Sequence, residues 1–327
     1  MPLARPPRHS LSRRTGPRHR PSSSRRRIRS PFKATRAAVK SIPERSRFSF
    51  PLRPRQAADL AAFACLAEVA SEKPGNVTLR RGLPGLSPFD FLHSASALRA
   101  GFSSSGARSV GRLVLTTIRR TRRRVSTNTN LGLALILAPL AVASTRARST
   151  SLRKSLRQTL RGLTRHDAEQ VYEAIRLAGP GGLGKVKKQD VSQRPDRNLR
   201  ECMVLARRRD SIAAEYSSGY TLTFGTGAPA LKRALDQGFS IRQAIVMAYL
   251  KLLSVRPDSL ISRKHGSQTA RRVSRLAADV LKSGGISTAA GRCRTIALDR
   301  TLRSSCLNPG TTADLTAAAV YVTLVSD

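Results

Sequence analysis

Four short polar segments of this sequence combine side chains that can bind phosphate or metal ions with glycines that expose the backbone. They are residues 68–77, 127–132, 178–184 and 308–315. Each lies at the edge of an apolar run, where the unpaired N–H groups of a helix end are able to bind an anion. One such segment carries little information, but four in one chain predict a shared polar cleft.

Two acidic residues in these segments stand out because of their surroundings. Glu68 lies in an Ala- and Leu-rich helical pattern, where a buried carboxylate is costly unless it has a partner. Asp314 lies in the first turn of the last predicted helix, where interaction with the helix dipole is the alternative to a functional role. A further segment, residues 258–266, places Arg263, Lys264 and His265 next to one another, which would suit a polyphosphate.

Residues 179–186 satisfy two nucleotide-binding patterns, G-x-G-x-x-G and G-x-x-x-x-G-K. Val186, however, stands where a P-loop has Ser or Thr. Both motifs also require a preceding β-strand, whereas residues 167–178 have helical periodicity. We therefore predict that the glycines form a helix C-cap and a tight loop, which can still approach a phosphate.

Apolar residues recur at helical spacing along most of the chain, and no segment shows sustained period-two alternation. Helices are predicted at about 56–72, from Ser87-Pro88 onward, at 110–118, at 130–145 and after a capping box at 164–167. Further helical patterns cover about 198–217, 228–236, 240–254, 268–283 and 312–325. The sequence thus predicts an all-α fold, with a single multi-helix globular domain over residues 56–327.

Of the net charge of +41 over 327 residues, residues 1–55 carry +16, since they hold 17 Lys or Arg and one acid, and the remainder carries +25. This leader is rich in Arg, Ser and Pro and lacks apolar periodicity, so we predict that it is disordered. A transit peptide and upstream sequence from a wrongly chosen start are the alternatives. The Arg-rich stretch 119–124 suits either nucleic-acid phosphates or a solvated helix face, and no aromatic residues interleave it.

The remaining composition argues against other protein classes. The longest apolar run, residues 131–143, contains Pro139 and is shorter than the roughly 20 residues of a membrane span. The 4 cysteines form no C-x-x-C pair and the 5 histidines no H-x₃-H pattern, so neither a zinc site nor a disulfide framework is indicated. We expect a cytoplasmic protein without a membrane segment.

Together these segments resemble the triphosphoribosyl-dephospho-coenzyme A synthase family from about Ala58 to Val325. The resemblance rests on Glu-Val-x₃-Lys-Pro-Gly-Asn-Val (68–77), Phe-x₂-Ser-Ala (91–95), Asn-Thr-Asn-Leu-Gly (128–132), Ala-Ile-Arg-Leu-Ala-x-Pro-Gly-Gly-Leu-Gly (174–184), Arg-Asp-x-Ile-Ala-x₂-Tyr (209–216) and Asn-Pro-Gly-Thr-Thr-Ala-Asp-Leu (308–315). The combination is specific, although each motif alone is weak. Thr78 departs from the family pattern, in which many members have an acid or His shortly after Lys-Pro-Gly, and this leaves room for a different acceptor.

The resemblance implies a transferase that joins ATP and 3′-dephospho-coenzyme A through their riboses and releases adenine. Such a reaction needs a carboxylate to accept the proton of the attacking 2′-hydroxyl. It also needs Mg²⁺ and Lys or Arg side chains to hold the triphosphate. The resemblance implies Glu68 and Asp314 as catalytic residues and Asp90 and Asp314 as Mg²⁺ ligands. The implied substrate- and nucleotide-binding set is Lys73, Asn76, Asn128, Asn130, Gly182, Gly184, Arg263, Lys264 and Asn308.

Three other functions are weighed against this one: a same-fold transferase with a different acceptor, a basic nucleic-acid-binding protein, and an inactive scaffold. A transferase should gather Glu68, Asn128 and Asp314 around one cleft, whereas a nucleic-acid binder should spread Arg over one convex face. The expected partners are therefore the two small-molecule substrates, and a homo-oligomer is compatible with the sequence.

The P-loop interpretation is open to a direct test. If residues 179–186 formed a P-loop, Val186→Ser would restore the hydroxyl that binds Mg²⁺ and improve ATP affinity. We expect no gain from this substitution, whereas a bulky residue at Gly182 or Gly184 should weaken binding because glycine permits φ > 0 or close backbone approach. ATP titration measures the affinity of each variant. Tighter ATP binding by Val186→Ser would support the P-loop interpretation.

Overall fold

The computed structural model describes residues 50–104, 109–146 and 151–325. Over these residues the chain forms helices and no β-strand, apart from two isolated bridges in residues 78–86. The elements are α1 (Pro54–Val69), α2 (Pro88–Ser104), α3 (Val110–Arg122), α4 (Leu131–Ser144), α5 (Leu152–Arg161), α6 (Arg165–Ala178), α7 (Leu199–Ala206), α8 (Ser211–Ser218), the π-helical η2 (Thr223–Gly227), α9 (Ala228–Asp236), α10 (Ile241–Val255), α11 (Ser259–His265), α12 (Ser267–Lys282), α13 (Ala289–Ser304) and α14 (Gly310–Val325). The predicted all-α fold is confirmed.

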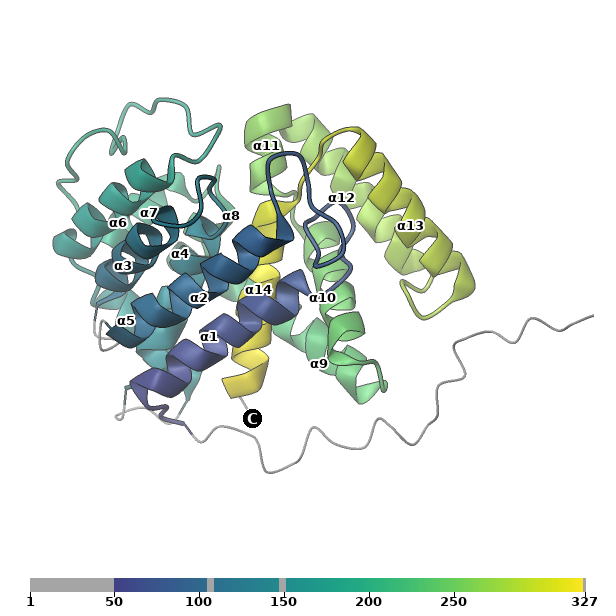
Figure 1. Ribbon diagram of the computed structural model, residues 1–327, viewed down its shortest axis with the longest axis horizontal. Coiled ribbons are helices and arrows are strands. Elements are labelled where there is room, and N and C mark those ends of the chain that lie inside the picture. The colour runs from purple at the N-terminus through teal and green to yellow at the C-terminus, as the bar shows by residue number, and fades with distance from the viewer. Residues whose placement is uncertain (1–49, 105–108, 147–150, 326–327) are drawn as a thin grey trace, which may run out of the picture. The chain divides into compact units, whose positions relative to one another are not determined.

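Helices α4 and α14 form the centre of the core because they are apolar on nearly all sides. Buried residues make up 13 of the 14 positions of α4 and 12 of the 16 positions of α14. A helix of this kind is stable only when neighbours cover every face, and α14 accordingly packs against α1, α4, α9 and α10 (Figure 1). None of the described helices has both the length and the apolar character needed to cross a membrane.

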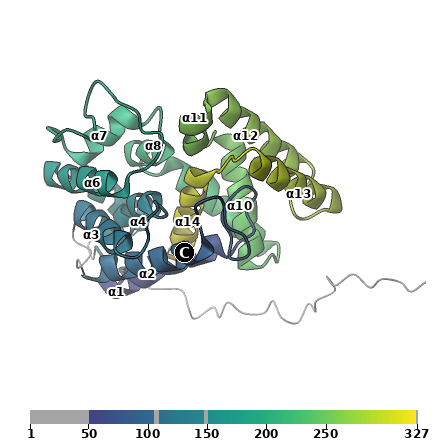
Figure 2. The same ribbon diagram turned by 45° about the horizontal axis from the view of Figure 1, so that its top comes forward.

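The buried side chains form two clusters that meet along α10 and α14. The larger cluster draws mainly on α1 to α10 and α14. The smaller one contains residues of α10 to α13, among them Tyr249, Val273 and Leu302. Figure 2 shows α11, α12 and α13 on one side of α14, with α3, α6 and α7 on the other. Ala313 belongs to the smaller cluster and Leu315 to the larger one, so the first turns of α14 lie where the two groups of helices meet.

Pro139 interrupts the backbone hydrogen bonding of α4 inside the core. Proline has no N–H, and its ring displaces the preceding turn, so carbonyls near Leu135 lose their usual partners. The Tyr216 hydroxyl donates to the Leu135 carbonyl at 2.7 Å, and the Tyr220 hydroxyl donates to the Ile136 carbonyl at 2.9 Å. These two buried tyrosines thereby attach α8 and the turn after it to the middle of α4.

The sequence patterns located most helices but missed three of them. The pattern at 198–217 is two helices, α7 and α8, because the Asp210 carboxylate accepts hydrogen bonds from Ile212 N–H and Ala213 N–H and starts a new helix. Helices α5, α11 and α13 were not predicted, since the first and third are mostly polar and the second has only seven residues. The stretch 119–124 includes the last turn of α3, and the capping box at 164–167 is confirmed.

The folded part begins before residue 56. Leu52 is 3% exposed, its N–H donates to the Ser144 carbonyl at 2.7 Å, and Phe50 packs against the larger cluster. Arg53 N–H donates to Gln56 Oε1 at 2.9 Å at the start of α1. Residues 50–55 therefore pack with the domain, and the rest of the predicted leader, residues 1–49, lies outside the described residues.

We expect a chain starting at Phe50 to be more stable than one starting at Gln56. The shorter chain loses the burial of Leu52, which corresponds to about 2 kcal/mol, and it also loses the hydrogen bond at the start of α1. Urea unfolding of the two truncations beside the full chain measures the difference. Equal free energies of unfolding for the two truncations would show that residues 50–55 contribute no stability.

Candidate active site

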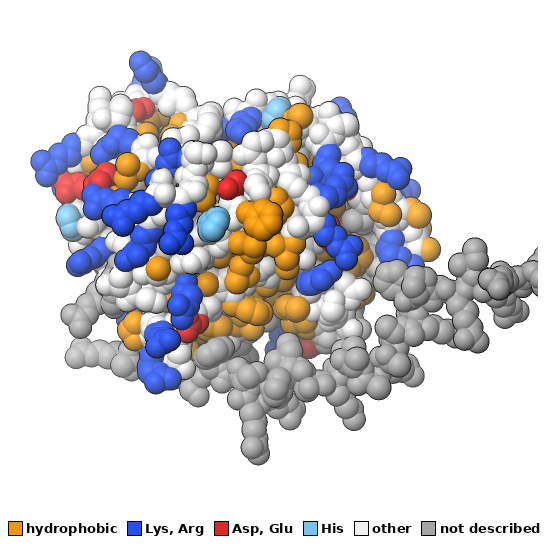
Figure 3. All heavy atoms as spheres, in the orientation of Figure 1, with side chains coloured by type: hydrophobic (Ala, Val, Ile, Leu, Met, Phe, Trp, Pro, Cys, Tyr) orange, Lys and Arg blue, Asp and Glu red, His pale blue; other side chains and the backbone are white. Residues whose placement is uncertain are grey.

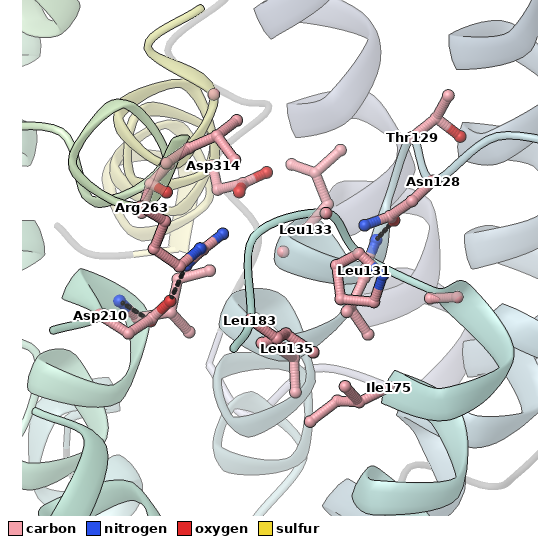
Figure 4. Close-up of a pocket in the computed structure, with 18 of the residues that line it drawn as sticks. Asn128, Thr129, Leu131, Leu133, Leu135, Ile175, Leu183, Asp210, Arg263 and Asp314 are labelled. Atoms are coloured by element: carbon pink, nitrogen blue, oxygen red, sulfur yellow. Dashed lines mark hydrogen bonds and ion pairs between the residues drawn. The ribbon is translucent and has the colours of Figure 1, made fainter. Parts of the chain in front are cut away.

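A pocket of about 740 Å³ opens where the N-terminal ends of α4, α8, α11 and α14 meet the C-terminal end of α1. All four polar segments contribute to its lining. Figure 4 shows Asp210, Arg263 and Asp314 on one side of the cavity and aliphatic side chains on the other. The lining contains seven of the side chains proposed from the sequence: Glu68, Asn76, Asn128, Arg263, Lys264, Asn308 and Asp314.

Glu68 is paired with Lys73 beside the pocket. The two residues are 2% and 1% exposed, and Lys73 Nζ lies 2.9 Å from Glu68 Oε1. The ammonium also donates hydrogen bonds to the backbone carbonyls of Glu68 and Ser71. Its contact with the carboxylate is therefore an ion pair, and Glu68 Oε1 accepts no hydrogen bond from the described residues. Helix α1 ends at Val69, and the turn that follows brings Lys73 back to the last turn of the helix. Glu68 therefore has the partner that its burial requires.

Asp314 lies in the first turns of α14, and none of the described Lys, Arg or His side chains forms an ion pair with it. Burial raises the pKa of its carboxyl well above the usual range, and the nearby charges of Glu68 and Asp258 act in the same direction. Its carboxylate accepts no hydrogen bond from any described residue. The space for it comes from Gly132 of α4, where a Cβ atom would lie only 1.9 Å from Asp314 Oδ2.

Arg263 lies on the same side of the cavity as Asp314 in Figure 4 and is held by Asp210. Its Nη1 lies 2.6 Å from Asp210 Oδ2, while Asp210 Oδ1 caps α8. Arg263 Nε is buried and has no hydrogen-bond partner among the described residues, and Lys264 beside it is exposed at the pocket. The ion pair with Asp210 thus orients the guanidinium, which retains N–H donors for an anionic ligand.

Asp258 joins two of the helix ends around the pocket. Its Oδ1 accepts hydrogen bonds from Leu260 N–H and Ile261 N–H at the start of α11, at 2.8 and 3.0 Å. Its Oδ2 accepts from the N–H and hydroxyl of Thr312 in α14, at 2.7 and 2.8 Å. Burial raises the pKa of this carboxyl, and the hydrogen bonds oppose the shift. Sequence reasoning missed Asp210 and Asp258 as site residues, although Asp before Ser at the start of an apolar pattern is an N-cap signal.

Asn76 and Asn308 meet across the pocket lining. Asn76 Nδ2 donates to Asn308 Oδ1 at 2.9 Å, and the Asn76 carbonyl accepts a hydrogen bond from Arg303 at 2.7 Å. Asp299 accepts from Gly75 N–H at 2.9 Å and pairs with Arg303 at 2.8 Å. Gly75 has φ +71 and a Cβ there would lie 2.6 Å from Leu302, so this turn requires glycine. Helix α13 thereby fixes the turn that carries Asn76.

The glycine-rich loop follows α6 and forms one wall of the pocket. Gly179 ends α6 in the left-handed conformation, which confirms the predicted C-cap, and the element before the loop is a helix and not a strand. Gly179, Pro180, Gly181 and Leu183 line the pocket. Gly182 has φ +78, and a Cβ there would lie 3.5 Å from Arg263 Cβ. Gly182 and Gly184 are outside the lining, so their predicted contact with a nucleotide stays a prediction.

Three other residues proposed from the sequence have their own structural partners away from the lining. Asp90 accepts a hydrogen bond from Ser87 N–H at 3.1 Å at the start of α2. Asn130 is 2% exposed and donates to the Ser94 carbonyl and the Thr121 hydroxyl. Lys73 is ion-paired with Glu68 and is not part of the lining. No group of three or more His, Cys, Asp or Glu side chains suited to a metal occurs in the described part of the chain.

These features define a class of protein: an all-α fold with one pocket, lined in part by the Glu68 and Asp314 carboxylates with the Arg263 and Lys264 cations and in part by aliphatic side chains. A family model described as ATP:dephospho-CoA triphosphoribosyl transferase matches residues 54–327. The chain belongs to this family, and the resemblance inferred from its motifs is confirmed.

The similar curated proteins are named "Probable 2-(5''-triphosphoribosyl)-3'-dephosphocoenzyme-A synthase". The one from Pseudomonas putida is 33% identical over 104 residues, which cover 32% of this chain and 37% of that protein. The one from Malonomonas rubra is 28% identical over 127 residues, or 39% of this chain and 40% of that protein. The matched regions thus span about two fifths of these relatives' length. A crystal structure from Archaeoglobus fulgidus, described as a candidate triphosphoribosyl-dephospho-coA synthase, has a TM-score of 0.57 and 28% identity, and covers 72% of this chain and 98% of that chain.

The close approach of Gly132 and Asp314 gives a prediction. We expect Gly132→Ala to displace the Asp314 carboxylate and to destabilise the protein by about 1–3 kcal/mol, as overpacking does. In an Asp314→Ala background the same change should cost much less, because the colliding carboxylate is gone. Chemical unfolding of both single variants and the double variant gives the coupling free energy.

Gly225→Ala serves as the control, because no atom lies within 4 Å of a Cβ at that position. Equal cost of Gly132→Ala in both backgrounds would mean that the carboxylate is not what requires glycine.

Proposed function

We propose that this protein transfers the triphosphoribosyl group of ATP to the 2′-hydroxyl of 3′-dephospho-coenzyme A and releases adenine. Family membership supports this reaction. The observation that carries the proposal is the meeting of Glu68 and Asp314 with Arg263 and Lys264 in one pocket. The reaction requires a base, an anion site and a polar surface for two riboses, and the pocket contains residue types suited to each.

Glu68 is the proposed base. A carboxylate that accepts the proton of the attacking hydroxyl must be ionised, and Glu68 is ion-paired with Lys73. Because Lys73 also donates to two backbone carbonyls, it stays in position when the carboxylate becomes protonated. Lys73 therefore acts through Glu68, in place of the direct nucleotide contact implied by the resemblance.

Arg263 and Lys264 are the proposed ligands of the triphosphate. Arg263 has a buried Nε without a partner, and Asp210 fixes the direction of its guanidinium. Arg122 and Arg209 add two exposed cations to the lining. The triphosphate is retained in this reaction and not cleaved, so these side chains bind and orient it. Asn76, Asn128 and Asn308 supply amide groups suited to ribose hydroxyls.

Mg²⁺ enters the proposal with ATP, and the residues of the pocket fit this ion. Mg²⁺ prefers carboxylate and phosphate oxygens. The Asp314 carboxylate has no hydrogen-bond donor among the described residues, and Glu68 Oε1 lacks a directed hydrogen bond. A cation would also relieve the repulsion between these two carboxylates. Asp314 would hold the ion together with phosphate oxygens, and the ion would neutralise part of the triphosphate charge. Asp90, the other implied ligand, is engaged with Ser87 outside the lining.

Nucleic-acid binding has less support. Arg119 is paired with Glu173, and the exposed Arg side chains of α3 lie at the end of one helix. On the face shown in Figure 3, Lys and Arg side chains lie on both sides of a central hydrophobic area. A continuous basic stripe is therefore missing from this face.

The test of the proposed function is adenine release. The purified protein is incubated with Mg-ATP and dephospho-coenzyme A, and the products are separated by chromatography. Free adenine together with a coenzyme A derivative that has gained a triphosphoribosyl group supports the proposal. ADP or AMP without adenine would indicate phosphoryl or nucleotidyl transfer. Replacing dephospho-coenzyme A by other ribonucleotides tests the same-fold alternative with a different acceptor.

Asp314→Asn should abolish turnover without unfolding the protein. The amide is nearly isosteric but is a poor Mg²⁺ ligand, so we expect adenine release to fall about a hundredfold or more. The midpoint of thermal unfolding should not fall, because a neutral group replaces a carboxylate that burial disfavours. Mg-ATP should raise the midpoint of the wild type more than that of the variant.

Asp279, whose side chain is 48% exposed, provides a matched control, since Asp279→Asn makes the same chemical change outside the pocket. Adenine release near the wild-type rate by Asp314→Asn would reduce Asp314 to a structural residue of α14.

A further inference from the structure

The pocket has an aliphatic half that the chemistry of ATP does not require. Its side chains are Leu133 and Leu135 of α4, Ile175 of α6, Leu183 of the glycine-rich loop, Met203 of α7 and Ile212 of α8. Leu133, Leu135, Met203 and Ile212 are between 4% and 8% exposed, so most of this wall is part of the packed interior. Figure 4 shows Leu133, Leu135, Leu183 and Ile175 across the cavity from Asp314, Arg263 and Asp210.

This division restricts what can occupy the aliphatic half. Triphosphate and ribose groups would lose their hydration there without gaining hydrogen bonds. A purine ring is usually held by stacking on flat side chains and by hydrogen bonds at its edge. The wall offers branched and flexible aliphatic side chains instead. The aromatic residues of the described lining are Phe91 and Tyr172, which are not part of this wall, and the Tyr172 hydroxyl donates to the Gln189 carbonyl at 2.8 Å.

Resting on the proposed function, we infer that the aliphatic half binds the pantetheine arm of the dephospho-coenzyme A acceptor. This arm is an uncharged chain in which a dimethyl-substituted carbon and several methylene groups alternate with two amides, and these apolar groups suit an aliphatic wall. It is joined through a diphosphate to the ribose that carries the attacking hydroxyl. When that ribose lies at Glu68, the diphosphate and then the arm extend away from the carboxylates.

The cationic residues of the lining can bind the diphosphate that joins the ribose to the arm. Arg263 lies with Asp210 and Asp314 on one side of the cavity in Figure 4, across from the aliphatic side chains, and Arg209 lies next to Asp210 in sequence and also lines the pocket. A diphosphate near Arg209 or Arg263 would leave the arm against Ile175, Leu135 and Leu183. The aliphatic wall would then select the acceptor, while the polar half performs the transfer.

The test compares binding of three ligands to two variants of the wall. Ile175→Gln and Leu183→Gln change side chains that are half-buried and 39% exposed, so both should fold. Calorimetric titration gives the Kd of dephospho-coenzyme A, of ADP, which lacks the arm, and of Mg-ATP. We expect each variant to raise the Kd of dephospho-coenzyme A about tenfold, as loss of buried apolar area predicts. The Kd values of ADP and Mg-ATP should remain unchanged.

Leu177→Gln is the matched control on the same helix, since Leu177 is 40% exposed and lies outside the lining. Unchanged dephospho-coenzyme A affinity in both wall variants would overturn the inference. A selective loss of ATP affinity would also overturn it and would assign the wall to the adenine of ATP. Equal losses for dephospho-coenzyme A and ADP would reject a subsite for the arm.

The inference and the proposed reaction can fail separately. If the wild type releases no adenine, but the variants lose affinity for dephospho-coenzyme A alone, the subsite is supported and the proposed reaction is wrong. If adenine is released and the variants bind all three ligands like the wild type, the reaction stands and the subsite is wrong.

Discussion

The partly buried carboxylate of Asp314 at the start of α14 is the constraint on which the rest of the site depends. Asp314 lies on a helix that is otherwise packed among apolar side chains, and its neighbour Glu68 has the same charge. A carboxylate in such a position is tolerated only if the surrounding elements leave room for it and its charge is met by a ligand. Gly132 provides the room, because α4 has no side chain where the carboxylate lies. The costly placement is what leads us to assign Asp314 a functional role.

Two capping residues fix the positions of neighbouring helix ends relative to one another. Asp210 and Asp258 each use one carboxylate oxygen to cap their own helix and the other to hold a distant group, Arg263 in the first case and Thr312 in the second. The starts of α8, α11 and α14 are therefore coupled by short polar contacts. A change at one helix start would alter the position of Arg263 relative to Asp314, although neither capping residue need touch a substrate.

Sequence periodicity predicted the all-α fold because most helices bury one apolar face, and it failed for α5, α11 and α13, which are polar or short. The motifs located the polar cleft, since Glu68, Asn76, Asn308 and Asp314 all line one pocket. Side-chain direction was not predictable from local sequence. Asn128 and Asn130 are two residues apart, yet Asn128 lines the pocket and Asn130 bonds to Ser94 and Thr121. Such partners are distant in sequence and leave no local pattern.

The two halves of the pocket are encoded differently in the sequence. The polar half is built from helix ends, where Asp, Asn and Gly form recognisable motifs, whereas the aliphatic half is built from helix faces such as Ile175 and Leu135. Leu and Ile at helical spacing look the same whether they fill a core or line a cavity. The polar motif residues carry the proposed reaction. Under the inferred subsite the choice of acceptor would depend on aliphatic residues both inside the motifs at 174–184 and 209–216 (Ile175, Leu183 and Ile212) and outside every motif (Leu133, Leu135 and Met203). If the pantetheine arm lies on this wall, a related chain could keep every polar motif and still use another acceptor by changing a few aliphatic side chains.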